Sequence, residues 1–320
     1  MLIGGLNETQ KKGTLTVYAF SQNKTSNLLE FRQELESKHS DLVTCLIQLN
    51  RNYLATSSFD KKIMIWFNDT TISKHEDIPS YKHVETLNEH LDIVLTLCNL
   101  TPILKGNNHE RKELRMASSS TDKKIIIWSA LFSDQKLGNF EAKQILNGHS
   151  DVAYSLLFFE EKQVFVSGSV DENIIFWSYN SQNEQYFQIQ TLQTNSGVWS
   201  LTELSKNLEF ASGHENGSIK IWSYKQEEFY LRQSLDNQHS DTIHCLLHLD
   251  NGDLISASPN DTNKINIYYF NLFENEFILK QSLNKINFPI TSLVKLTDGL
   301  FASSNFEDMS IKIWTPISVN

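Results

Sequence analysis

Short runs of apolar residues, separated by groups of Ser, Asp, Asn and Gly, recur along the whole chain. Residues 149–179 show the pattern most fully, with apolar runs at 152–159, 164–171 and 174–179. The runs are rich in β-branched and aromatic residues and are bounded by turn-forming residues, which favours strands over helices. The pattern therefore predicts three short β-strands in this stretch, joined by tight turns.

The same three-run pattern repeats, and each third run ends on an aromatic residue. Aligning the chain on that residue gives seven units, which end at Tyr18, Trp66, Trp128, Trp177, Trp222, Tyr268 and Trp314. Neighbouring end points lie 45 to 62 residues apart. A period of this size indicates repeats that stack, because one small unit cannot bury both of its faces alone. We therefore expect a single domain that spans residues 1–320.

Two insertions lengthen the period, one at residues 68–80 and one at residues 101–113. The second carries Lys105, His109, Arg111 and Lys112. Since loops that vary in length lie mostly on the surface, we interpret it as a solvated surface loop, with a partner contact as the alternative.

The net charge and the cysteines limit which cellular compartment and which classes of partner are expected. The chain carries a formal net charge of −10, which argues against nucleic-acid binding and mildly favours basic partners. Its three cysteines form no CxxC pair and are expected to be buried free thiols in a reducing compartment. No apolar run approaches the roughly 18 residues of a membrane span. We expect a cytoplasmic protein, with the nucleus left open, that binds no nucleic acid and no membrane.

No motif for enzyme chemistry is present. The chain has no phosphate-binding GxxxxGK[ST] loop, no GxSxG elbow and no HExxH zinc helix. Four histidines, His39, His90, His149 and His239, recur with the repeat period, whereas a catalytic residue is needed only once. We expect no catalytic residue, no metal site and no cofactor.

The repeated polar residues carry a resemblance. A His-x-Asp opening precedes four units, a Ser-rich second run follows, and an Asp lies six residues before the closing Trp, as in Asp171 and Trp177. This order resembles the WD-repeat family. The resemblance implies an all-β fold, a seven-bladed β-propeller of four-stranded antiparallel blades. The first blade is expected to be incomplete, because no innermost strand precedes residues 2–6, unless the natural chain extends upstream of Met1.

The resemblance also implies a structural hydrogen-bond relay in each blade, from a His and a turn Asp through a Ser or Thr to the Trp indole. Unpaired buried polar groups cost about 1–3 kcal/mol each, so such groups need partners. Three sets are predicted: His39, Asp60 and Trp66; His90, Asp122 and Trp128; His149, Asp171 and Trp177. The fifth and seventh units lack the opening His and are expected to rely on packing. In the sixth, Tyr268 is expected to give a weaker relay.

Partner-binding residues are predicted where the repeat leaves the residue type free. One such position lies near the start of each first strand, where alternation turns the side chain away from the core, toward the mouth of the central channel. The candidates are Thr44, Leu95, Tyr154, Trp199, His244 and Thr291, with Phe59 and Val170 before the turn Asp. Aromatic residues at such a site are typical of interface anchors. The alternative is that these side chains only plug the channel.

The function implied is a non-enzymatic protein-interaction scaffold in a multi-protein complex, which docks a protein or peptide partner, favourably a basic one, at the channel mouth. One alternative is a modified-peptide reader or a substrate receptor of a ubiquitin ligase. The other is a propeller hydrolase or lactonase, which would need several carboxylates or histidines to converge. Of the six first-strand candidates, only His244 would serve such a site.

Overall fold

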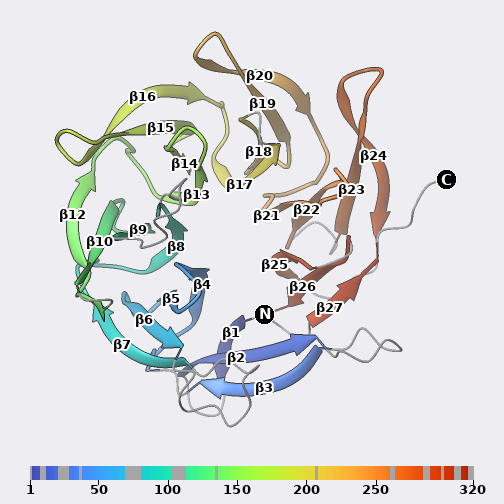
Figure 1. Ribbon diagram of the computed structural model, residues 1–320. Helices are drawn as coiled ribbons and strands as arrows, with labels where there is room; N and C mark the ends of the chain where they lie inside the picture. Colours follow the sequence, from blue (N-terminus) through green and yellow to red (C-terminus); the bar gives the residue numbers. More distant parts are fainter. Residues whose placement is uncertain are drawn as a thin grey trace, which may run out of the picture. The chain divides into compact units, whose positions relative to one another are not determined.

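In the computed structural model, whose strands are labelled in Figure 1, the chain divides into two compact units, residues 1–147 and 148–320. The prediction of a single domain stays a prediction. The structure describes residues 2–7, 12–20, 29–35, 38–68, 81–101, 113–133, 136–205, 208–259, 264–283, 289–296, 299–305 and 311–315, with side chains from residue 38 onward. The 68–80 insertion and the 101–113 loop lie almost entirely outside these residues.

Unit 1 contains three antiparallel sheets. The first is built from β1 (Leu2–Asn7), β2 (Lys12–Phe20) and β3 (Leu29–Leu35). The second is built from β4 (Val43–Gln48), β5 (Tyr53–Ser58), β6 (Ile63–Asn68) and β7 (Tyr81–Leu87). The third is built from β8 (Val94–Asn99), β9 (Glu113–Ser120), β10 (Ile125–Ser133), the two-residue β11 (Lys136–Leu137) and β12 (Glu141–Leu146).

Unit 2 contains four antiparallel sheets. The first is built from β13 (Ala153–Phe159), β14 (Val164–Ser169), β15 (Asn173–Asn180) and β16 (Gln185–Gln193). The second is built from β17 (Val198–Ser205), β18 (Glu209–His214), β19 (Ile219–Lys225) and β20 (Glu228–Leu235). The third is built from β21 (Cys245–His248), β22 (Leu254–Ser258), β23 (Lys264–Asn271) and β24 (Glu276–Leu283). The fourth is built from β25 (Ile290–Lys295), β26 (Phe301–Asn305) and β27 (Ile311–Trp314).

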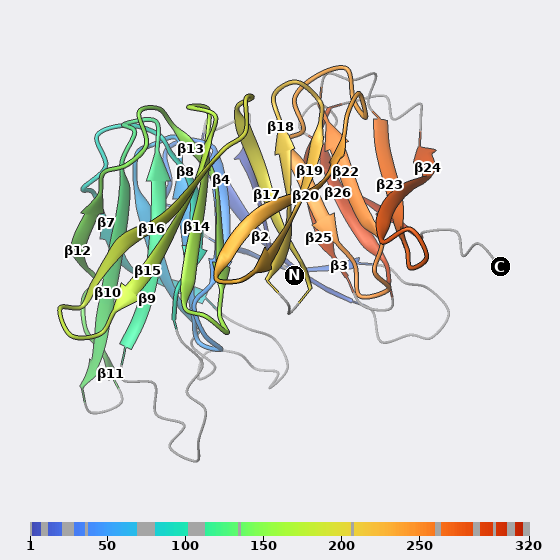
Figure 2. The same cartoon turned by 90° about the horizontal axis from the view of Figure 1, so that it is seen from above.

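The all-β class is confirmed, and the described residues contain no helix. In the four-stranded sheets the strands follow one another in sequence order, the arrangement of an antiparallel propeller blade (Figure 2). In the β8–β12 sheet both β11 and β12 pair with β10. The predicted count of seven blades is corrected to six, the sheets from β4 to β27 whose side chains are described. Only the backbone of the β1–β3 sheet is described, so it does not establish a seventh blade; the β25–β27 blade shows three strands among its described residues.

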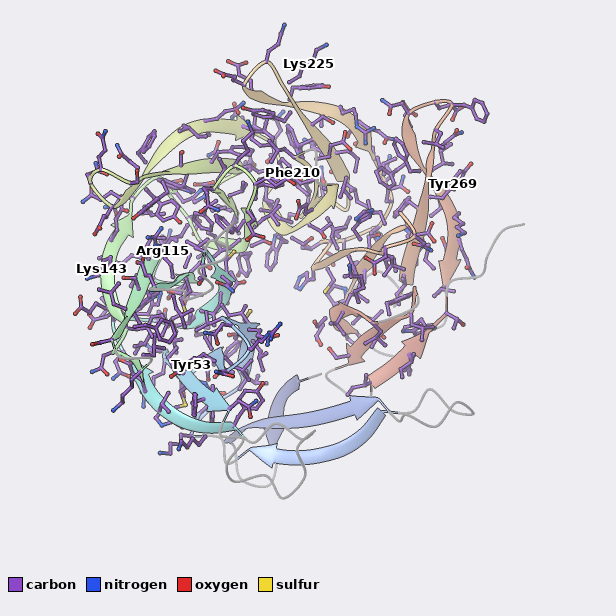
Figure 3. All side chains as sticks on the ribbon, viewed as in Figure 1. Tyr53, Arg115, Lys143, Phe210, Lys225 and Tyr269 are labelled. Atoms are coloured by element: carbon purple, nitrogen blue, oxygen red, sulfur yellow. The ribbon has the colours of Figure 1, made fainter. Side chains whose placement is uncertain are left out.

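The core lies between neighbouring blades because the second and third strands are apolar on both faces. In unit 2, Phe176 and Phe229 stack with ring centroids 4.1 Å apart, and Phe210 packs with both (Figure 3). Gln190 on β16 adds a polar clamp between two blades: its amide donates to the Phe229 carbonyl over 2.8 Å and accepts from the Phe229 N–H over 3.0 Å. Packing and clamp together fix adjacent blades against each other within the unit.

Candidate functional site

Each relay brings together groups that lie far apart in the chain. His149 precedes β13, and its Nδ1 lies 2.9 Å from Oδ2 of Asp171, in the turn between β14 and β15. Its Nε2 lies 2.7 Å from Oγ of Ser167, to which the Trp177 indole donates over 2.9 Å. Of the two serines expected in this blade, Ser167 and Ser169, the structure places Ser167 in the relay. Ser169 instead accepts the Asp171 N–H over 3.1 Å.

The other two predicted sets have the same geometry. His39 lies 3.0 Å from Asp60 and 2.9 Å from Thr56, and Trp66 donates to Thr56 over 2.9 Å. His90 lies 3.0 Å from Asp122 and 2.7 Å from Ser118, and Trp128 donates to Ser118 over 2.8 Å. The rings and carboxylates are almost fully buried, so the relays are inaccessible and structural.

The turn carboxylates are stabilised in their charged form. Burial alone would raise the pKa of Asp171, but the hydrogen bond and charge of His149 and two backbone N–H donors outweigh it and lower the pKa to about 2. The pKa values of Asp60 and Asp122 are lowered by the same combination. A carboxyl group whose pKa is lowered by folding stabilises the folded chain at pH values above its ordinary pKa near 3.8. This stability is lost as the pH falls toward the pKa of the group in the folded chain.

The expectation that the fifth unit relies on packing alone is wrong. His214, from the end of β18, is fully buried, and its Nε2 lies 2.8 Å from Oγ of Ser212. Its Nδ1 lies 3.3 Å from the Ser196 carbonyl, and the Trp222 indole donates to Ser212 over 2.7 Å. Burial lowers the pKa of His214 to about 4. A relay is therefore present with its histidine on a strand instead of in the preceding loop.

The last two blades have partial relays. In the β21–β24 blade, His239 Nε2 lies 2.7 Å from Oγ of Ser256, and the Tyr268 hydroxyl lies 3.3 Å from the same oxygen, longer than the 2.7–2.9 Å of the indole bonds, as expected for a weaker relay. In the last blade, Trp314 donates to Ser303 over 2.8 Å.

The partner-site candidates on the first strands share an unforeseen feature: five of them sit at a break in strand register. In β13, Ala153 pairs with Ser169 and Ser155 with Gly168, so Tyr154 is the extra residue of a β-bulge. The other bulge residues are Thr44, Leu95, Trp199 and Thr291, while His244 directly precedes β21. Bulges redirect a side chain out of the regular sheet. The bulge, rather than the strand alternation we assumed, turns these side chains from the core.

Three of these residues, Tyr154, Trp199 and His244, form a continuous stack of rings within unit 2, which we call the aromatic stack. The rings of Tyr154 and Trp199 have centroids 3.9 Å apart at 26°, and those of Trp199 and His244 lie 4.7 Å apart at 19°. Tyr154 and Trp199 are half-buried and His244 is exposed. The indole N–H of Trp199 is buried and has no hydrogen-bond acceptor among the described residues.

Acidic groups surround the stack. Burial raises the pKa of Tyr154, and the Asp151 carboxylate adds to that effect. Burial lowers the pKa of His244, and the Asp241 carboxylate opposes it. Glu215 lies against Gly197, two residues before Trp199: a Cβ at that glycine would lie 2.9 Å from Glu215 Oε2. The stack thus has a negative surrounding.

The remaining candidates lie outside the aromatic stack. Thr44 donates to the Val94 carbonyl over 2.6 Å and so links two blades of unit 1, where Leu95 is half-buried. Thr291 is exposed, and its hydroxyl lies 3.0 Å from that of Ser304. Val170 is half-buried in unit 2, with its backbone beside Gly197, and Phe59 is 39 % exposed in unit 1.

The part of the chain that the structure describes offers neither a metal site nor a membrane-spanning helix. Among the described residues, no group of three or more His, Cys, Asp or Glu side chains has the spacing to hold a metal ion. The described ranges hold no helix with the length and apolar character that crossing a bilayer requires. The three cysteines, Cys45, Cys98 and Cys245, are free thiols, and burial raises the pKa of each.

Comparison with known proteins agrees with this geometry. The family model "WD domain, G-beta repeat" matches residues 30–66, 140–178 and 187–223. The chain is 35 % identical over 94 residues to "WD repeat, SAM and U-box domain-containing protein 1" of Gallus gallus, 29 % of this chain and 20 % of that protein. It is 25 % identical over 232 residues to "Protein transport protein sec13" of Aspergillus oryzae, 63 % of this chain and 74 % of that protein. "Elongator complex protein 2" of Schizosaccharomyces pombe is 25 % identical over 224 residues, 62 % of this chain and 26 % of that protein. The chain therefore spans about a fifth of the first relative and about a quarter of the last.

Proposed function

From the premise that the chain is built of WD40 repeats, we propose that it is a non-enzymatic scaffold that docks a protein or peptide partner on the aromatic stack. The observation that carries the proposal is the stack itself. Three blades of unit 2 present Tyr154, Trp199 and His244 from the same position in the repeat, outside every relay.

The chemistry of the stack suits a protein partner. Aromatic rings combine a large apolar area with a polar edge, and such residues carry most of the energy in many interfaces. The Trp199 indole N–H is buried, so a partner would meet the ring of Trp199 and not its N–H. Because the rings already cover one another's faces, a partner would contact their edges and the outer faces of the stack.

The acidic surrounding favours a basic segment of the partner. Asp151, Asp241 and Glu215 place negative charge beside the stack, and the whole chain carries −10. Complementary charge mainly speeds association and excludes wrong partners. The relatives named for protein transport and for the Elongator complex are consistent with a place in a multi-protein assembly. The compartment we propose for it is the cytoplasm or the nucleus.

A substrate receptor of a ubiquitin ligase is the second candidate. The observation that favours it is the relative whose name includes a U-box, which matches this chain over 94 residues. In that case the same stack would bind the substrate, so the identity of the bound protein separates the two roles.

The test is an affinity pull-down with the wild-type chain, identification of the bound protein by mass spectrometry, and measurement of its Kd. Trp199→Ala should weaken binding by roughly 2 kcal/mol or more, about thirtyfold, if Trp199 is a central anchor. Thr291→Ala is the matched control, because Thr291 occupies the same bulge position outside the stack and should leave Kd nearly unchanged. Undiminished partner recovery by folded Trp199→Ala and Tyr154→Ala variants would exclude this surface as the main site.

A further inference from the structure

The β23–β24 hairpin exposes two large apolar side chains at its tip. Leu272 is 84 % exposed and Phe273 is fully exposed, the highest values among the exposed large apolar residues. Figure 1 shows this hairpin extending outward from its sheet. Single exposed apolar side chains are common on protein surfaces, but an adjacent Leu-Phe pair at a hairpin tip requires a reason.

The turn does not need apolar residues at this point, because the β15–β16 hairpin of the same unit builds the same turn with polar ones. Asn271 Oδ1 accepts the Phe273 N–H over 2.9 Å, and Asn180 Oδ1 accepts the Gln182 N–H over 2.8 Å. The two turns then reach matching left-handed residues, Asn275 at φ 57° and Glu184 at φ 56°.

The tips of the neighbouring hairpins are polar. Ser181 and Gln182 occupy the places of Leu272 and Phe273, and the β19–β20 hairpin presents the charged Lys225 (Figure 3). Because the β15–β16 hairpin forms the same turn without apolar residues, folding of the hairpin does not explain the Leu-Phe pair.

The apolar tip is also held in place from the next blade. Arg232 on β20 donates from Nη1 to the Asn275 carbonyl over 2.9 Å, and its guanidinium lies 5.2 Å from the Phe270 ring centroid. Its side chain is only 10 % exposed. A hairpin fixed in this way loses little conformational freedom when it binds, which favours affinity.

We propose that Leu272 and Phe273 form a second docking element, which inserts into an apolar pocket with a basic rim on a partner protein. Glu274 and Glu276 flank the tip and are exposed, so the surrounding charge complements a basic rim and opposes approach to an anionic membrane. Burial of each apolar side chain strengthens binding by on the order of tenfold to a hundredfold. This surface is separate from the aromatic stack and does not depend on the function proposed for it.

The first test is site-specific photo-crosslinking of the full chain. A photoreactive benzoylphenylalanine is placed at residue 273, or at residue 182 as the matched control, in lysate of cells that express the protein. An excess of the unlabelled wild-type chain should abolish the adduct at residue 273, whereas an excess of the chain with Leu272→Ser and Phe273→Gln should not. No adduct sensitive to the wild-type competitor, an adduct of two copies of this chain, or equal adducts at residue 182 would overturn the proposal, as would binding to anionic phosphatidylserine vesicles that requires Phe273.

The second test exchanges the tips. Leu272→Ser with Phe273→Gln copies the β15–β16 tip and should lower the affinity for the crosslinked protein at least tenfold, with an unchanged melting temperature. Ser181→Leu with Gln182→Phe is the reverse exchange and should not create the site, because the uncharged Asn183 and Gln185 stand there in place of Glu274 and Glu276. An unchanged affinity of the first variant would overturn the proposal. Because the aromatic stack is untouched in both variants, that failure would leave the stack proposal standing.

Discussion

Two neighbouring blades of unit 2 each bury a histidine that contacts the relay serine, but the histidine comes from a different place in the chain in each blade. In the β13–β16 blade, His149 comes from the loop before the first strand and pairs with the carboxylate of Asp171. In the β17–β20 blade, His214 comes from the second strand and pairs with the backbone carbonyl of Ser196. Both imidazoles then meet a serine that also accepts a tryptophan indole.

The comparison indicates that the relay serine can receive an imidazole from either of two positions in the sequence. The Ser–Trp end of the relay is the same in both blades, with indole bonds of 2.9 and 2.7 Å. The end of the relay beyond the histidine differs in charge. His149 pairs with the buried carboxylate of Asp171, whereas His214 pairs with the uncharged carbonyl of Ser196. The two blades should therefore respond differently to loss of the turn residue and to acid.

The largest difference is expected at the turn between the second and third strands. Asp171→Ala should lower the free energy of unfolding by about 2–4 kcal/mol, because it breaks a buried polar network and leaves His149 without its partner. Asn216→Ala, at the same place in the next blade, should cost about 1 kcal/mol, since Asn216 accepts only the backbone N–H and hydroxyl of Ser218. Urea unfolding of both variants measures the two decreases in unfolding free energy. Equal decreases would contradict the difference that we infer between the two blades.

The sequence predicted the elements that repeat with a strong chemical pattern. Strands at 152–159, 164–171 and 174–179 correspond to β13, β14 and β15, because alternating turn residues and β-branched runs leave few other choices. The relay partners of His149 could be named because the resemblance to the WD-repeat family implies the relay, and the six-residue Asp–Trp spacing marks its members in this sequence.

Other features could not be predicted because they depend on pairing between strands. His214 was missed because the expected imidazole was sought only in the loop before the first strand, and a His at the end of β18 reads as an ordinary strand residue. The bulges at Tyr154 and Trp199 are invisible in one strand alone, since a bulge is a mismatch between two strands. The stacking of Tyr154 on Trp199 joins two of these bulge residues, and His244, which directly precedes β21, completes the stack. Their shared register in the repeat had already grouped the three.

A smaller difference between the blades is expected in acid. The pKa of His214 is about 4 in the folded chain, so the unfolded chain binds more protons between pH 6.5 and 4. Stability from this group is complete above pH 6.5 and falls as the pH drops toward 4. His214→Gln removes the titrating group, and the slope of unfolding free energy against pH should flatten by up to about 1.4 kcal/mol per pH unit. Urea unfolding at pH 7, 6 and 5 measures the slope, and identical slopes would contradict a neutral buried His214.

The central claim is a division of roles: relay residues hold the blades, while the bulge residues Tyr154 and Trp199 form a binding surface. The most direct test is the free energy of unfolding of Trp199→Ala. We expect a loss of no more than about 1.5 kcal/mol, because Trp199 is half-buried and contributes mainly ring stacking. A loss as large as that of Asp171→Ala would contradict the account and show that the stack serves to hold the blades together.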